Sequence, residues 1–134
     1  MRQLRATRAA LDEVVAHARA DAPDECCGLL LGVGDVVDEV LRARNIQRSP
    51  TRFQIHPEDH FAAIRRARSS GRLVVGAYHS HPRGPRTPSP TDAAEVNDPA
   101  LVHVIVSLDA EPPSVLAFAW HDGNFVPLTL VPVP

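Results

Sequence analysis

Apolar residues recur at helical spacing in two stretches of the chain. Residues 7–20 carry them at positions i, i+3, i+4 and i+7, which predicts an amphipathic helix that ends at the Ala-Pro-Asp sequence following it. Residues 57–70 begin with a proline suited to the first helical position, continue with two acidic residues suited to the positive end of a helix, and stop before Gly71. The positions expected to face the core are Leu11, Val14, Val15, Ala18, Phe61, Ile64 and Ala67.

Shorter apolar runs predict strands. Residues 26–33 form one run bounded by glycines, and residues 36–43 would pair with it across a turn at Gly34 and Asp35. A short helix is expected to start near Pro90. Further strands are predicted at residues 73–80, 101–108, 115–120 and 125–130.

The last predicted strand and its surroundings are rich in proline. Pro127, Pro132 and Pro134 place this segment at a sheet edge, because proline cannot donate a ladder hydrogen bond. Strands, hairpins and helices are interspersed along the chain, which predicts an α/β (α+β) fold with helices flanking a mixed β-sheet. A length of 134 residues fits one domain over residues 1–134.

The composition is that of a globular protein, with 44% hydrophobic and 22% charged residues. A net charge of -2 does not favour nucleic acid or an anionic membrane as a partner. The start of the chain lacks the apolar core of a signal peptide and no apolar run approaches a membrane span, so we expect a cytoplasmic protein. Cys26 and Cys27 are neighbours, and we expect free thiols that pack on opposite faces of a strand.

The segment AYHSHPRGPRTPSPTD, residues 77–92, carries the candidate chemistry. Side chains alternate along a strand, so His79 and His81 project from one face and can reach a common zinc ion. Pro82 ends the strand, and a loop stiffened by prolines leads to Asp92 on the first turn of the next helix. We expect Asp92 to be the third ligand, through a carboxylate oxygen.

Two histidines and one carboxylate leave a fourth tetrahedral position for water, as in catalytic rather than structural zinc sites. Zinc lowers the pKa of such a water and polarises a carbonyl group, so the expected cofactor is one catalytic Zn²⁺ ion. Glu25 is the expected general base. It stands at the start of an apolar run, where partial burial would raise the pKa of its carboxyl toward a useful range.

The pattern His-x-His-Pro at 79–82, six residues, Ser89, two residues, Asp92, with Glu25 upstream in PDECCGLLLG, closely resembles the JAMM (MPN-plus, Mov34-type) metalloproteases. The small bacterial stand-alone members are the most similar. The resemblance implies the JAMM/MPN fold, which is similar to the cytidine-deaminase architecture. It also implies hydrolysis of a peptide or isopeptide bond at the C-terminus of a ubiquitin-like or sulfur-carrier protein. In this scheme Glu25 transfers the proton and the Ser89 hydroxyl stabilises the oxyanion.

Several residues near the site have a second interpretation. Ser89, followed by Pro90, is also a typical helix N-cap with Asp92 closing a capping box, and we expect that an Asp92 bound to zinc could not also close the box. Arg83 and Arg86 border the site. They would meet an acidic surface or carboxylate of the substrate, or remain solvated loop charges.

Other polar and aromatic residues are expected to be structural. His56 and His60 are four positions apart, but the first lacks the adjacent glutamate of a zincin helix. His103 alternates within an apolar strand and is expected to be a hydrogen-bonded sheet histidine. Tyr78 faces opposite to His79 and is expected in the core.

Two other functions share parts of this pattern. RadC-like proteins, which are associated with DNA repair, have the same His-x-His-Pro and Ser-x-x-Asp spacing but usually carry an added helical DNA-binding segment. A non-catalytic MPN scaffold holds an assembly together after loss of the ligands. A zinc nucleoside deaminase is ruled out, because it needs a Pro-Cys-x-x-Cys sequence downstream of its histidine.

Overall fold

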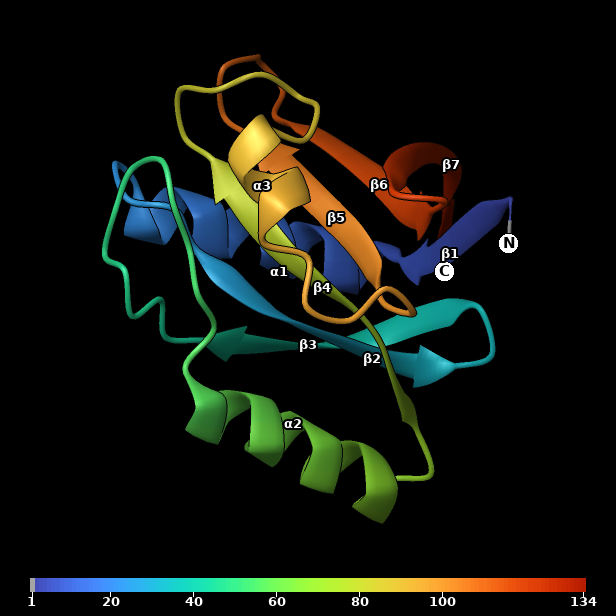
Figure 1. The fold of residues 1–134 in the computed structure, drawn as a ribbon. Coiled ribbons are helices and arrows are strands. Elements are labelled where there is room, and N and C mark those ends of the chain that lie inside the picture. The colour runs from blue at the N-terminus through green and yellow to red at the C-terminus, as the bar shows by residue number, and fades with distance from the viewer. Residues whose placement is uncertain (1) are drawn as a thin grey trace.

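Seven strands close into one barrel in the order β1-β3-β2-β4-β5-β6-β7 over residues 2–134, the part of the chain that this computed structural model describes (Figure 1). The strands are β1 (Gln3–Thr7), β2 (Cys27–Val33), β3 (Val36–Ala43), β4 (Leu73–His81), β5 (Val102–Ser107), β6 (Ser114–His121) and β7 (Asn124–Val133). The helices are α1 (Arg8–Asp21), α2 (Pro57–Ser69) and α3 (Pro90–Ala94). Parallel and antiparallel ladders both occur, so the predicted mixed α+β architecture is confirmed.

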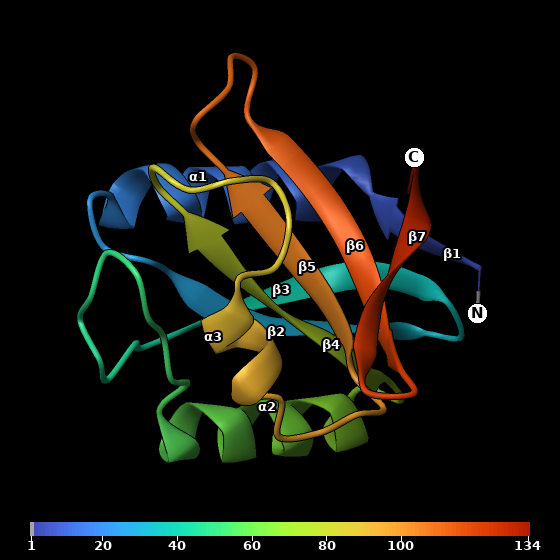
Figure 2. The same cartoon turned by 45° about the horizontal axis from the view of Figure 1, so that its top comes forward.

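Strand β2 is buried on both faces, which explains its uninterrupted apolar run. Leu30 belongs to the cluster that includes Val14 of α1, whereas Leu29 and Leu31 point the other way and pack with Ala63 of α2. The two views show α1 and α2 on opposite sides of β2 and β4 (Figures 1 and 2). The strands that carry the candidate site are therefore held between two apolar layers.

Both long helices begin and end close to the predicted residues. Thr7 caps α1 by accepting a hydrogen bond from the Ala10 N–H at 3.1 Å. His56 caps α2 through Nδ1, which accepts from the Glu58 N–H at 3.1 Å, so this imidazole serves the helix end. Gly71 follows α2 with a φ of 69°, which glycine adopts without a Cβ penalty. Across residues 2–134, no helix is both long and apolar enough to cross a membrane.

The expectation that Phe61 faces the core is wrong, because its side chain is 61% exposed. Helix α2 instead approaches the sheet through Ala63 and Ala67, one helical turn apart, whose small side chains allow close packing on β2. Ile64 is half-buried. Phe61 lies on the wall of a cavity that also contains His79.

The expectation that the prolines mark an edge strand is also wrong, because β7 pairs with two strands in turn and lies within a closed barrel. Strand β6 pairs with residues 124–128 of β7, and β1 pairs with residues 129–133. Pro127 therefore lies on the β6 ladder alone and Pro132 on the β1 ladder alone, where a missing N–H is tolerated. Strand β1, which the sequence pattern did not predict, closes the barrel.

Gly28→Ala tests the close packing of β2 on Tyr78. A Cβ at Gly28 would collide with the buried Tyr78 ring and lie 2.5 Å from the Leu41 carbonyl oxygen. We expect the free energy of unfolding, measured by urea titration, to fall by about 3 kcal/mol. Gly34→Ala is the control, because its φ of 63° strains an alanine while nothing lies within 4 Å of the added Cβ. That control should lose about 1 kcal/mol, and equal losses would contradict the contact.

Candidate active site

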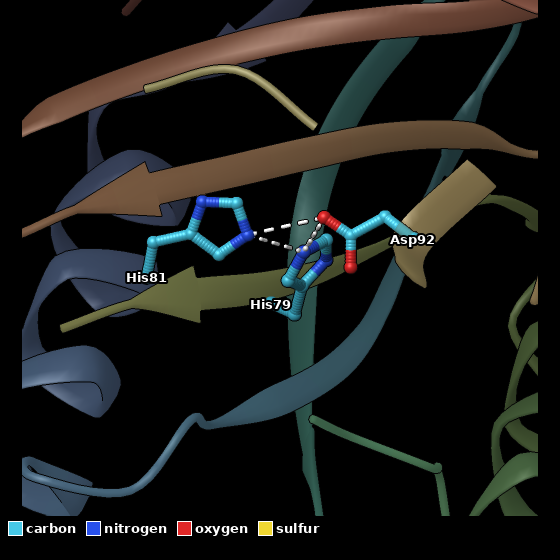
Figure 3. A group of neighbouring side chains, drawn as sticks. All are labelled: His79, His81 and Asp92. Atoms are coloured by element: carbon cyan, nitrogen blue, oxygen red, sulfur yellow. Dashed lines mark hydrogen bonds and ion pairs between the residues drawn. The ribbon is translucent and has the colours of Figure 1, made fainter. Parts of the chain in front are cut away.

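The end of β4 brings two imidazole rings and one carboxylate together. His79 and His81 point from one face of the strand, and Asp92 reaches them from the first turn of α3 (Figure 3). The Nε2 atoms of the two histidines lie 3.2 Å apart, and Oδ2 of Asp92 lies 3.2 Å from the first and 3.1 Å from the second. The three side chains are only 3%, 6% and 7% exposed. The structure thus gathers the three residues expected as metal ligands into one buried triangle.

This triangle fits a metal ion. Ligand atoms on a tetrahedral ion with bonds of about 2.0–2.1 Å are about 3.3 Å apart. His81 Nδ1 lies 2.7 Å from the Pro85 carbonyl oxygen, which only accepts, so Nδ1 carries the proton. In its neutral form, His81 therefore turns the lone pair of Nε2 toward Asp92 Oδ2. Two acceptors then face each other, and either a proton on Nε2 or a metal ion between them would satisfy both.

Oδ2 of Asp92 serves the helix as well as the triangle. It accepts from the Ser89 N–H at 2.9 Å, while Ser89 Oγ accepts from the Asp92 N–H at 3.0 Å, which completes a capping box. The expected conflict between the box and the ligand role does not arise, because a carboxylate oxygen accepts in more than one direction. Burial raises the pKa of Asp92, but hydrogen bonds and charges of both histidines outweigh it and hold the pKa well below its ordinary value.

The two histidines differ in their surroundings. Phe53 stacks on His79, with ring centroids 4.3 Å apart and 16° between the planes. Burial lowers the pKa of His79 in spite of Asp92, which favours the neutral imidazole that binds metals. Burial also lowers the pKa of His81, but Asp92 and the Pro85 carbonyl outweigh it and raise the pKa above its ordinary value. Phe53 was missed in the sequence, because no spacing relates its irregular segment to β4.

Glu25 is a buried carboxyl group without a full set of partners. Its side chain belongs to a residue that is 3% exposed, and Oε1 makes no hydrogen bond with any described residue. Burial raises the pKa of Glu25 to about 8, against a smaller lowering by the charge of His81. An unpartnered oxygen at such a place is available to a water or a reactant.

Three hydrogen bonds fix the backbone around Glu25. Its N–H donates to the Ser49 carbonyl at 2.8 Å, and its carbonyl accepts from Asn45 Nδ2 at 3.1 Å. The following N–H, of Cys26, donates to Ser80 Oγ at 2.8 Å. Asn45 also holds the loop after β3, through hydrogen bonds with the backbone of Gln47, Arg52 and Gln54. Asn45 and Ser80 were missed in the sequence, because polar residues of this kind are common in loops and strands.

The triangle contributes walls to two cavities. One has a volume of about 640 Å³ and contains His79 and Asp92 together with apolar residues that include Phe61. The other has a volume of about 620 Å³ and contains Glu25 and His81. A bound ligand that passes over the three side chains would therefore find space on both sides of them.

The remaining residues expected near the site are distributed as follows. Ser89 and Arg83 line the cavity of Glu25, whereas Arg86 does not. Cys26 and Cys27 are fully buried free thiols, and burial raises the pKa of each to about 12, so they are packing residues, as expected.

Tyr78 lies in the core, as expected, with its hydroxyl 2.7 Å from Nδ1 of the buried His17. The expectation that His103 is hydrogen-bonded is wrong for one of its ring nitrogens, because Nε2 of His103 is buried and makes no hydrogen bond with residues 2–134. The His103 ring packs instead edge-on against Phe125, with ring centroids 5.2 Å apart.

Comparison with known proteins places the chain in a wider group. The model of a family described as prokaryotic homologs of the JAB domain matches residues 7–121. A desampylase of Haloferax volcanii is 31% identical over 128 residues, which is 90% of each chain. A probable TtuB-protein conjugate cleaving protease of Thermus thermophilus is 33% identical over 125 residues, 92% of this chain and 80% of the relative.

Two solved structures agree with this match. The solution structure of protein DSY2949 from Desulfitobacterium hafniense is 31% identical, with a TM-score of 0.90 over 98% of this chain and 93% of that one. A structure described as "JAMM: a metalloprotease-like zinc site in the proteasome and signalosome" is 25% identical, with a TM-score of 0.61 over 96% of this chain and 98% of that one.

Glu25 should make the metal-free protein less stable as the pH rises. Its folded-state pKa of about 8 lies above the ordinary value of 4.5, so the folded protein keeps a proton that the unfolded chain releases. This stabilisation is complete at acidic pH below the ordinary value. It is lost as the pH rises through the folded-state pKa, by at most about 1.4 kcal/mol per pH unit.

Urea titrations of chelator-treated protein between pH 5 and pH 8 would measure this loss. Wild type should lose a few kcal/mol more than Glu25→Gln, which has no proton to release. Glu111→Gln, whose side chain is 87% exposed in a loop, is the control and should behave as wild type. Equal declines for wild type and Glu25→Gln would contradict the buried position of the carboxyl.

Proposed function

The chain belongs to the prokaryotic JAB-domain branch of the JAMM/MPN metalloprotease family, and on that premise we propose that it is a zinc-dependent hydrolase of ubiquitin-like or sulfur-carrier protein conjugates. The bond is a peptide or isopeptide bond at the C-terminus of the carrier. The observation that carries this proposal is the buried triangle of two imidazoles and one carboxylate beside an unpartnered glutamic acid.

His79, His81 and Asp92 would hold one zinc ion. When bound, zinc supplies a water of lowered pKa and polarises the carbonyl of the bond to be cleaved. The hydrogen bond from His81 Nδ1 to Pro85 fixes the tautomer, so that Nε2 is free to ligate. The capping box and the Phe53 ring orient the other two ligands.

Glu25 moves the proton in this scheme. Its unpartnered Oε1 would take a proton from the attacking water and return it to the leaving amine. Burial raises the pKa of Glu25 in the metal-free protein, and the charge of a zinc ion bound nearby would lower it again, so that the carboxyl group can both gain and lose a proton near neutral pH. Its fixed backbone, held by Asn45 and Ser49, limits the positions that the carboxyl can take.

Ser89 would stabilise the oxyanion while it caps α3. Its Oγ accepts a hydrogen bond from the Asp92 N–H, which uses a lone pair and leaves the hydroxyl proton free to donate. Ser89 lines the same cavity as Glu25. The two interpretations of Ser89 are therefore compatible, and the cap supports the catalytic role by fixing the hydroxyl.

The substrate class rests on the relatives. One is named a desampylase and another a probable protease that cleaves TtuB-protein conjugates, and both match nine-tenths or more of this chain. The two cavities agree with a substrate that extends to both sides of the scissile bond. The set of ligands and base is complete, which favours an enzyme over the scaffold alternative.

Zinc binding tests the first step of this proposal. Purified protein should hold about one zinc ion per chain by mass spectrometry of its metals, and His79→Ala or Asp92→Ala should lose it, because two ligands hold zinc far less firmly than three. His103→Ala is the control. His103 lines the neighbouring cavity without reaching the triangle, so this variant should keep the metal. Full retention of zinc in both ligand variants would contradict the site.

Cleavage tests the second step. Zinc-loaded protein, incubated with a sulfur-carrier protein extended or conjugated beyond its Gly-Gly terminus, should release the carrier cut after Gly-Gly, as read by mass. A chelator should abolish this. Glu25→Gln should keep zinc and fold but lose turnover by about 10²–10⁴-fold. Ser89→Ala should lose about 10²-fold, whereas Ser89→Thr, which keeps hydroxyl and cap, should retain most activity. Unchanged turnover in Glu25→Gln would remove Glu25 from the mechanism.

A further inference from the structure

The cavity of Glu25 contains one cationic side chain that has no partner. Its walls are formed by Pro23, Glu25, Pro50, Thr51, His81, Pro82, Arg83, Gly84, Pro85 and Ser89. Arg83 is exposed and takes part in no ion pair or side-chain hydrogen bond with the described residues. Several other exposed arginines, such as Arg65 and Arg68, also make no ion pair within residues 2–134, but no arginine other than Arg83 lines this cavity. A guanidinium left free on a cavity wall is available to an anion.

The loop that carries Arg83 is held in place. The two carbonyls that follow it are both bound, Gly84 by the Ser107 hydroxyl at 3.0 Å and Pro85 by His81 Nδ1 at 2.7 Å. A Cβ on Gly84 would lie 3.1 Å from Cβ of His81, so the loop passes close to the strand. Pro82 and Pro85 flank the segment and limit its backbone further. Arg83 is thus presented from a fixed backbone, while its long side chain can adapt.

The leaving amine belongs in this cavity. Hydrolysis breaks the C–N bond, adds the water oxygen to the acyl carbon and gives a proton to the nitrogen. In the proposed function, on which this step rests, Glu25 delivers that proton. Since Glu25 lines this cavity and not the other one, beside His79, the group attached to the nitrogen is expected in the Glu25 cavity.

We propose that this cavity binds a leaving group with a free carboxylate, namely a single amino acid or short peptide joined through its α-amine, and that Arg83 binds the carboxylate. The carboxyl group of Glu25, which would be left as a carboxylate once it has given its proton to the leaving amine, and the guanidinium of Arg83 line the same cavity. An amino acid product is a zwitterion, with an ammonium for Glu25 and a carboxylate for Arg83. A volume of about 620 Å³ accommodates a small ligand of this kind.

The test compares one leaving group with and without its charge. A sulfur-carrier protein is extended beyond Gly-Gly by alanine, with a free carboxylate, or by alaninamide, and kcat/KM is measured by mass for the zinc-loaded enzyme. Wild type should prefer the alanine substrate by about 10-fold or more. Arg83→Ala should lose this preference, chiefly through slower cleavage of the alanine substrate. Arg83→Lys should recover part of it.

Arg86→Ala is the matched control, because Arg86 has the same charge on the same loop but does not line the cavity. It should keep the wild-type preference. Binding of both carriers to zinc-loaded Glu25→Gln, which should not cleave them, gives a readout independent of turnover. The alanine form should bind more tightly, and adding Arg83→Ala should abolish the difference.

The outcomes separate this inference from the proposed function. Equal cleavage and equal binding of the two carriers by wild type would overturn the inference and leave the hydrolase proposal intact. A third substrate joins the carrier to Nε of a lysine whose α-carboxylate is blocked. If wild type cleaves this substrate faster than the alanine substrate, the inference about Arg83 is overturned and protein conjugates are favoured as substrates. If zinc-loaded wild type cleaves none of these substrates, both proposals fall.

Discussion

The register between β2 and β4 is the constraint on which the site depends. Antiparallel pairing sets Cys27 opposite His79, and Ser80 and Cys26 exchange two more hydrogen bonds, one of them to the Ser80 hydroxyl. These contacts fix the backbone next to Glu25 relative to the histidines. Because side chains alternate, a slip by one residue would turn His79 to the face where Tyr78 now lies in the core. The same pairing therefore builds the sheet and sets the base against the ligands.

Apolar packing on both faces of β2 stabilises this register against the cost of the buried polar groups. Burying a carboxyl without partners costs a few kcal/mol, and burying one leucine side chain contributes about 1.5–3 kcal/mol. Leu29, Leu30 and Leu31 lie in one strand, directed alternately toward α2 and α1. Several buried leucines next to the site can thus offset one unpartnered Glu25.

The sequence predicted the parts of the molecule that local spacing determines. Helices α1 and α2, the β2–β3 hairpin and the convergence of His79 with His81 all follow from a period of 3.6 or 2 along a short segment. The closure of the barrel by β1 could not be predicted, because it depends on which distant strand covers the rest of β7.

Residues that support the site were missed for a related reason. Phe53 and Asn45 lie in an irregular segment and contact His79 and the Glu25 backbone, which are distant in sequence. Phe61 was misplaced because the pattern of apolar residues does not show that two alanines bring α2 close to the sheet. Loop residues of this kind carry no period, so only the tertiary structure reveals their partners.

The polar groups of the site fall into two kinds, and the difference has a physical meaning. His79, His81 and Asp92 face one another, and each is also supported by a ring, a carbonyl or a backbone N–H of the protein. Glu25 Oε1 and the Arg83 guanidinium have no such support among residues 2–134. An unpaired buried carboxyl oxygen has a stability cost, whereas an exposed guanidinium is solvated by water. What joins the two groups is their place, because both lie on the walls of the same cavity, within reach of one bound substrate.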